Sequence, residues 1–79
     1  MPYITKNRRE ALDSGNLPQN AGELNYMFYS ISRHYAFYKG ECYQTYNDII
    51  GALEGSKLEI YRRDIANYEE EKIKSNGDI

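Results

Sequence analysis

The sequence predicts an all-α fold with a short N-terminal helix, an amphipathic middle helix rich in aromatic residues, and a long C-terminal helix of about 30 residues. Three observations predict it. Glycine and proline divide the 79 residues into three segments, N-capping residues stand at or near the start of each, and apolar residues in the last two recur at spacings of three and four. We expect one domain over residues 1–79, with an N-terminal arm at 1–4 and a polar tail at 75–79.

The first helix is predicted from about Thr5 to Ser14. Thr5 can cap its start, and Gly15 can end it. A helix this short must dock to persist. The residues before it are expected to pack as an extended arm, with Tyr3 and Ile4 as anchors.

The second helix is predicted from about Ala21 to Lys39, with Asn20 as N-cap and Glu23 completing a capping box. One apolar face is predicted from residues spaced by three and four: Leu24, Met27, Phe28, Ile31, Tyr35 and Tyr38. Further aromatic side chains lie off that face, at Tyr26, Tyr29 and Phe37. A helix that is aromatic on more than one side is deeply buried or shared with a partner, so we assign these three to an interface.

The third helix is predicted from Thr45 or Tyr46 to Lys74, capped by Thr45 with Asp48. One stripe is expected along it: Tyr46, Ile50, Leu53, Lys57, Tyr61, Asp64 or Ile65, and Tyr68. Thirty helical residues span about 45 Å, which exceeds the width of so small a globule. The end of this helix is therefore expected to project into solvent or to pack on another subunit, and a homo-oligomer is predicted.

Gly51 and Gly55 lie four residues apart inside the third helix, where each costs about 1 kcal/mol relative to alanine. With Ala52 and Ser56 they form a smooth strip. Such a strip lets another backbone approach closely. The second helix, a second copy of the chain and a ligand lying against bare backbone are the three candidates.

A cationic and aromatic set suggests a site for a small anionic ligand such as a nucleotide: Lys57, Tyr61, Arg62, Arg63 and Arg33. Arginine binds phosphate through its planar guanidinium, and a tyrosine ring offers a face for a base. Arg8, Arg9 and His34 could join this set. The alternative is a solvated helix surface.

That alternative predicts helix-supporting ion pairs. Glu59 with Arg63, and Glu70 with Lys74, stand four residues apart. Arg62 shares a face with Gly55 and is therefore the better candidate for holding an anion.

Composition excludes several function classes. A net charge of −2 argues against broad nucleic-acid binding, and no apolar run is long enough for a membrane helix. Cys42 is the only cysteine and His34 the only histidine, so we predict no internal disulfide, no metal site and no cofactor. These two residues make a weak candidate for a catalytic pair. We expect Cys42 to be a small buried thiol, no catalytic residues and no enzyme activity. A lone cysteine also fits the cytoplasm.

Several motifs along nearly the whole chain carry a resemblance: residues 2–4 (PYI), 20–26 (NAGELNY), 51–54 (GALE), 57–63 (KLEIYRR), 68–69 (YE), 72–73 (KI) and 76–79 (NGDI). With these motifs the chain resembles a family of small uncharacterised proteins of bacteriophages and bacteria. The resemblance implies a phage accessory protein in the host cytoplasm that counters host defence by stoichiometric binding. Its target would be a host protein or a nucleotide signal. The alternative is a structural component of the virion or of its assembly.

Overall fold

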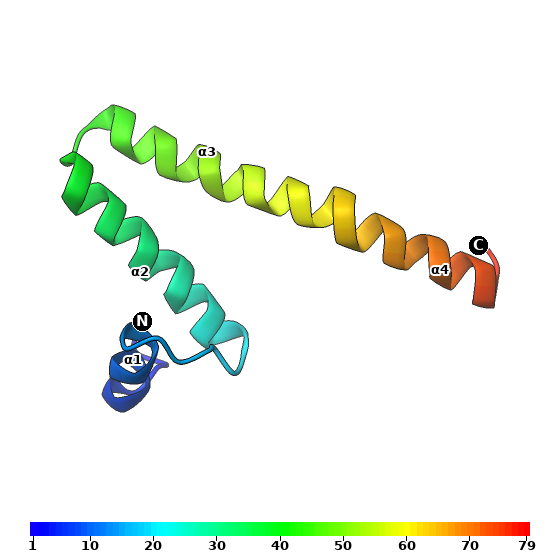
Figure 1. The fold of residues 1–79 in the computed structure, drawn as a ribbon, viewed down its shortest axis with the longest axis horizontal. Coiled ribbons are helices and arrows are strands. Elements are labelled where there is room, and N and C mark those ends of the chain that lie inside the picture. The colour runs from blue at the N-terminus through cyan, green and yellow to red at the C-terminus, as the bar shows by residue number, and fades with distance from the viewer. The chain divides into compact units, whose positions relative to one another are not determined.

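A computed structural model describes residues 1–79, and all its regular elements are helical, as predicted (Figure 1). In chain order these are α1 (Lys6–Asp13), α2 (Ala21–Lys39), α3 (Tyr43–Ile60), a π-helical turn η1 (Tyr61–Ile65) and α4 (Ala66–Asn76). The chain forms two compact units, an N-terminal unit of Met1–Thr45 and a C-terminal unit of Tyr46–Ile79. None of the helices combines the length and the apolar character that a membrane crossing requires.

The first two predicted N-caps are confirmed. The Thr5 hydroxyl accepts the Arg8 amide N–H at 3.2 Å, and the Asn20 side-chain oxygen accepts the Glu23 amide N–H at 2.9 Å. Gly15 follows α1 with a φ of 106°, a left-handed conformation that glycine adopts without strain. The boundaries of α1 and α2 therefore follow from local sequence signals.

The predicted extended arm is wrong, because residues 1–4 fold into a turn. The Ile4 amide N–H donates to the Met1 carbonyl oxygen at 3.3 Å, and the Ile4 side chain is buried. The Tyr3 ring lies against α2 at Gly22, where an added Cβ would stand only 3.3 Å from the ring. Both predicted anchors thus contact the unit, from a turn that brings them close together.

The core of the N-terminal unit is small. Its buried apolar side chains are Ile4, Leu12 and Ala36, and the polar residues Glu23 and Thr45 are buried as well. The predicted apolar face of α2 remains largely exposed, at Leu24, Phe28, Ile31 and Tyr38. Helix α1 contacts α2 through Glu23 and Tyr26 instead, because polar side chains on α1 bond to both.

The third helix begins at Tyr43, two residues before the predicted start, so Thr45 does not cap it. Thr45 lies in the first turn, where its buried hydroxyl donates to the Gly40 carbonyl oxygen at 2.8 Å. The helix continues to Asn76, which shortens the predicted polar tail by two residues. Elements α3, η1 and α4 run on as one helix of about 34 residues, roughly 51 Å long at 1.5 Å per residue.

The π-helical turn was not predicted. The Ala66 amide N–H donates to the Tyr61 carbonyl oxygen five residues earlier, where an α-helix would use the fourth. One extra residue in a turn rotates every later side chain back by about 100°. The turn therefore changes which residues of α4 share a face with those of α3.

Candidate functional site

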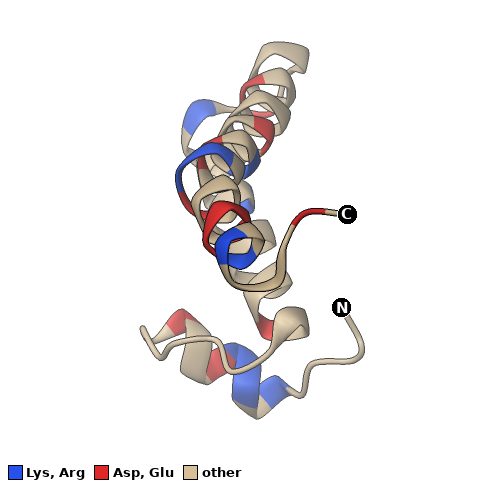
Figure 2. Cartoon of the chain, turned by 90° about the vertical axis from the view of Figure 1, so that its right-hand side faces the viewer, with Lys and Arg blue, Asp and Glu red and all other residues tan.

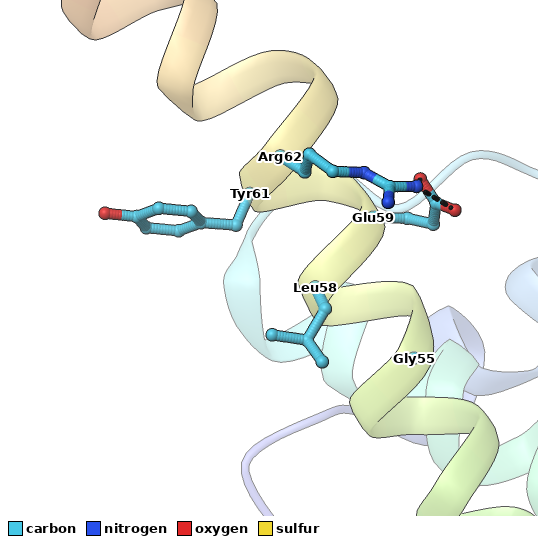
Figure 3. Close-up of a pocket in the computed structure, with 5 residues that line it drawn as sticks. All are labelled: Gly55, Leu58, Glu59, Tyr61 and Arg62. Carbon is cyan, nitrogen blue, oxygen red and sulfur yellow. Dashed lines mark hydrogen bonds and ion pairs between the residues drawn. The ribbon is translucent and has the colours of Figure 1, made fainter.

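The C-terminal unit offers an almost entirely solvent-facing surface, since every residue from Ile50 to Ile79 is exposed. A shallow notch opens on it, lined by Gly55, Leu58, Glu59, Tyr61 and Arg62 (Figure 3). Three of these five were predicted site residues. The notch is open because Gly55 has no side chain, and a Cβ built on Gly51 or Gly55 meets no heavy atom within 4 Å.

Two of the three arginines of the predicted site, Arg62 and Arg63, bind one carboxylate. Arg62 Nη2 lies 2.8 Å from each Glu59 oxygen, and Arg63 Nε lies 2.7 Å from Glu59 Oε2. The hydrogen bonds from Arg63 and then Arg62 hold the pKa of Glu59 below its usual range. The predicted Glu59–Arg63 pair is confirmed. Arg62, expected to be the freer of the two, shares the same acceptor.

The remaining cations of the predicted set also have partners nearby. Lys57 Nζ lies 3.3 Å from Glu54 Oε1. Arg33, in the N-terminal unit, lies 3.7 Å from Glu41. The ring of Tyr61 projects from the opposite side of the helix to the Arg62–Glu59 pair (Figure 3). The structure thus places Lys57, Tyr61 and both arginines within two turns of one helix but does not aim them at a common point.

Lys74 is paired differently from the prediction. Its Nζ lies 3.6 Å from Glu71 Oε1, three residues away, in place of Glu70. Positive and negative residues alternate along the long helix (Figure 2).

An ion pair that the sequence did not predict joins α1 to α2. Arg8 donates from Nε to Glu23 Oε2 at 2.9 Å and from Nη2 to Glu23 Oε1 at 2.7 Å. The Gln19 amide N–H donates to the same carboxylate at 3.0 Å. Glu23 therefore also accepts a hydrogen bond from the residue before the N-cap. The Arg8 hydrogen bonds, and after them the one from Gln19, lower the pKa of Glu23.

This pair takes Arg8 out of the candidate site. Arg9 is engaged as well, since its Nη1 donates to the Ile4 carbonyl oxygen at 2.6 Å. The two residues of the ion pair stand 15 positions apart, and no spacing rule links positions so distant. Only the capping-box position of Glu23 pointed to a structural role for it.

The three predicted interface aromatics lie in different surroundings. Tyr26 is half-buried, and its hydroxyl donates to Asp13 Oδ1 at 2.9 Å. Burial, followed by this hydrogen bond, raises the pKa of Tyr26. Tyr29 is exposed, and Phe37 is 90% exposed. Tyr26 therefore joins α1 to α2, while Tyr29 and Phe37 are available on the surface.

Cys42 is exposed, so the expectation of a buried thiol is wrong. Cys42 lies in the turn that precedes α3, and its Sγ is 3.4 Å from the Thr45 hydroxyl oxygen. His34 is exposed on α2. No three His, Cys, Asp or Glu side chains lie close enough together to hold a metal ion.

The chain was compared with protein families, curated proteins and solved structures. Neither the curated proteins nor the solved structures include a significant match to the chain. A family model described as a domain of unknown function, DUF6899, matches residues 1–79. That match spans all the motifs discussed above, and the chain therefore belongs to the DUF6899 family.

Proposed function

We propose that this protein is a non-enzymatic binding protein that acts as a homo-oligomer. It binds a partner protein through exposed aromatic side chains of α2. The observation that carries the proposal is the exposure of Phe37 and Tyr38, which are 90% and 84% exposed next to each other. Other large apolar side chains of α2 are exposed too: Leu24, Phe28, Tyr29 and Ile31.

Exposed apolar surface of this kind is typical of protein-binding sites. Single apolar side chains are common on surfaces, but this one helix of 19 residues exposes six. Aromatic residues dominate the binding energy of many interfaces because they bury a large area with few rotatable bonds. The resemblance to small phage and bacterial proteins supports a bacterial host protein as the partner, bound stoichiometrically to counter host defence.

Affinity capture tests this proposal. The tagged full chain is mixed with bacterial lysate, and the captured proteins are identified by mass spectrometry. We expect one bacterial protein at fixed stoichiometry, lost with Phe37→Ala or Tyr38→Ala. The matched control is Leu17→Ala, which removes an apolar side chain that is 83% exposed in the loop before α2. Capture that survives both aromatic substitutions contradicts the proposal.

A second candidate is sequestration of a small anionic nucleotide at the notch beside Gly55. The observation in its favour is the position of Arg62 at the edge of bare helix backbone. A bound phosphate would have to compete with Glu59 for both arginines. Thermal-shift measurements with a panel of nucleotides test it. A shift that Arg62→Ala abolishes and Lys74→Ala preserves supports this candidate, and no shift with any nucleotide rejects it.

A further inference from the structure

The C-terminal unit carries an apolar stripe that continues through the π-helical turn. We define the apolar stripe as the exposed side chains of Leu53, Tyr61, Ile65 and Ile73. In an uninterrupted α-helix, Ile73 would lie about 120° around the helix from Tyr61, twelve residues earlier. The extra residue in η1 takes back about 100° of this rotation, so Ile73 returns to the face of Tyr61.

The stripe is symmetric in residue type about Arg63, the middle residue of η1. Apolar residues occupy positions at equal distances on the two sides: Leu53 and Ile73, and Tyr61 and Ile65. Charged residues on the same face are symmetric in position and opposite in sign: Glu54 and Lys72, Lys57 and Glu69.

Helix spacing places these charges beside the stripe, since Lys57 stands four residues before Tyr61 and Glu69 four before Ile73. Lys57 pairs with Glu54 three residues earlier at 3.3 Å, and Lys72 Nζ lies 5.5 Å from the centre of the Tyr68 ring. Glu69 stands one position after Tyr68 and three before Lys72. Each half of the stripe thus has one glutamate followed by one lysine at a spacing of three.

We propose that residues 53–73 pair with the same segment of a second copy in an antiparallel arrangement centred on Arg63. This pairing rests on the homo-oligomer proposed above and specifies how two copies associate. A two-fold axis at Arg63 brings every residue level with its symmetric position in the other copy. Lys57 then lies opposite Glu69 of the second copy, and Glu54 opposite its Lys72. Each dimer contains this set of four charges twice, with apolar residues between the two sets.

The charges select this orientation over the parallel one. A parallel pair in register would place Lys57 against Lys57 and Glu54 against Glu54, and like charges across a helix pair oppose association.

Sedimentation equilibrium of the full chain tests the pairing. We expect a dimer at tens of micromolar, and we expect Lys57→Glu to weaken it at least about tenfold, because two glutamates then face each other twice. Glu69→Lys should weaken it similarly through facing lysines. The combined Lys57→Glu, Glu69→Lys chain should recover the affinity of the natural sequence. Lys74→Glu is the matched control, since Lys74 lies off the stripe and pairs with Glu71.

Disulfide crosslinking tests the orientation. Cys42→Ser removes the only cysteine, and two chains are then made, one with Lys57→Cys and one with Glu69→Cys. Their mixture should crosslink, and neither chain should crosslink alone, because positions 57 of the two copies would lie about 18 Å apart along the helix. The mixed dimer should still form, because one of its two sets of four charges is unchanged.

The outcomes are decisive in both directions. A monomer at tens of micromolar overturns the pairing, as do crosslinks between two Lys57→Cys chains or a dimer that Lys57→Glu leaves unchanged. Circular dichroism of each variant separates lost pairing from lost helix. All of these measurements use the purified chain alone, so they fail or succeed independently of the partner capture by α2.

Discussion

The two units use the same kind of ion pair in different ways. In the N-terminal unit, Arg8 and Glu23 join two helices, and the carboxylate is nearly buried. In the C-terminal unit, Arg63 and Glu59 lie one turn apart on the exposed surface of one helix. The first pair holds tertiary structure together, whereas the second only supports a helix that already exists. The N-terminal unit is thus stabilised by contacts between its own helices, whereas the C-terminal unit exposes nearly all of its side chains to solvent.

The largest expected effect is in the N-terminal unit. Leu12 is 1% exposed, and Leu12→Ala should lower the free energy of unfolding by about 2–5 kcal/mol, because it leaves a cavity between α1 and α2. Leu17→Ala removes the same atoms from an exposed site and should change the free energy of unfolding by less than about 0.5 kcal/mol. Urea unfolding followed by tyrosine fluorescence measures both. Equal effects of the two substitutions would contradict the core described here.

Acid should destabilise the N-terminal unit through Glu23. Its pKa is lowered in the folded state, so the unfolded chain takes up the proton first as the pH falls. The stability from the Arg8–Glu23 pair is therefore complete above the usual glutamate pKa of about 4.3 and is lost as the pH falls through the lower, folded value. Melting temperatures between pH 7 and pH 3 measure this loss.

Two variants isolate that contribution. Glu23→Gln should lower the melting temperature at pH 7 and flatten its dependence on pH. Glu59→Gln should change the melting temperature and its pH dependence much less, because the Glu59 ion pairs lie within one exposed helix. The pKa of Glu59 is nevertheless lowered, as that of Glu23 is. An unchanged acid profile for Glu23→Gln would show that other groups control the unfolding.

The third prediction is a stabilisation in the C-terminal unit. Gly55→Ala should stabilise the helix by about 1 kcal/mol, because alanine loses less backbone freedom and its methyl group meets only open space. Gly77→Ala is the control and should give no gain, since Gly77 ends the helix with a φ of 81°. Thermal unfolding followed at 222 nm measures both variants. If Gly55→Ala abolishes nucleotide or partner binding, the notch has a function. Gly55 would then be kept for binding although it makes the helix less stable.

The smallest effect is expected for Arg63→Ala. Glu59 keeps its bonds to Arg62, and the pair is exposed, so the melting temperature should remain nearly unchanged. Arg8→Ala, the equivalent substitution in the N-terminal unit, should lower it clearly. If the two substitutions cost the same, the contrast between the units is wrong.

Much of the fold could be predicted from the sequence. Thr5 and Asn20 cap the first two helices as expected, and α2 has the predicted bounds, because a cap and its amide lie within three residues of each other. The π-helical turn could not be predicted in this way. Lys57, Tyr61 and Ile65 follow one another at two successive spacings of four, which also occur on ordinary amphipathic α-helices.

The candidate site was harder to predict than the fold. The sequence correctly marked Arg62 and Gly55 as neighbours on one face, since helix geometry relates positions seven apart. It did not reveal that Arg62 and Arg63 bind the same carboxylate, because long side chains reach partners that helix position alone does not specify.

By itself, then, the sequence determined where α1 and α2 lie, how their first turns are capped and which of their residues share a face. Each of these depends on neighbours within about one or two turns of helix. The tertiary structure alone decided which face of α2 is covered, since that depends on how α1 docks. Arg8 meets Glu23 and Tyr26 meets Asp13 across gaps of 15 and 13 residues. Contacts so distant in sequence form only when the chain folds back, and no periodic pattern encodes them.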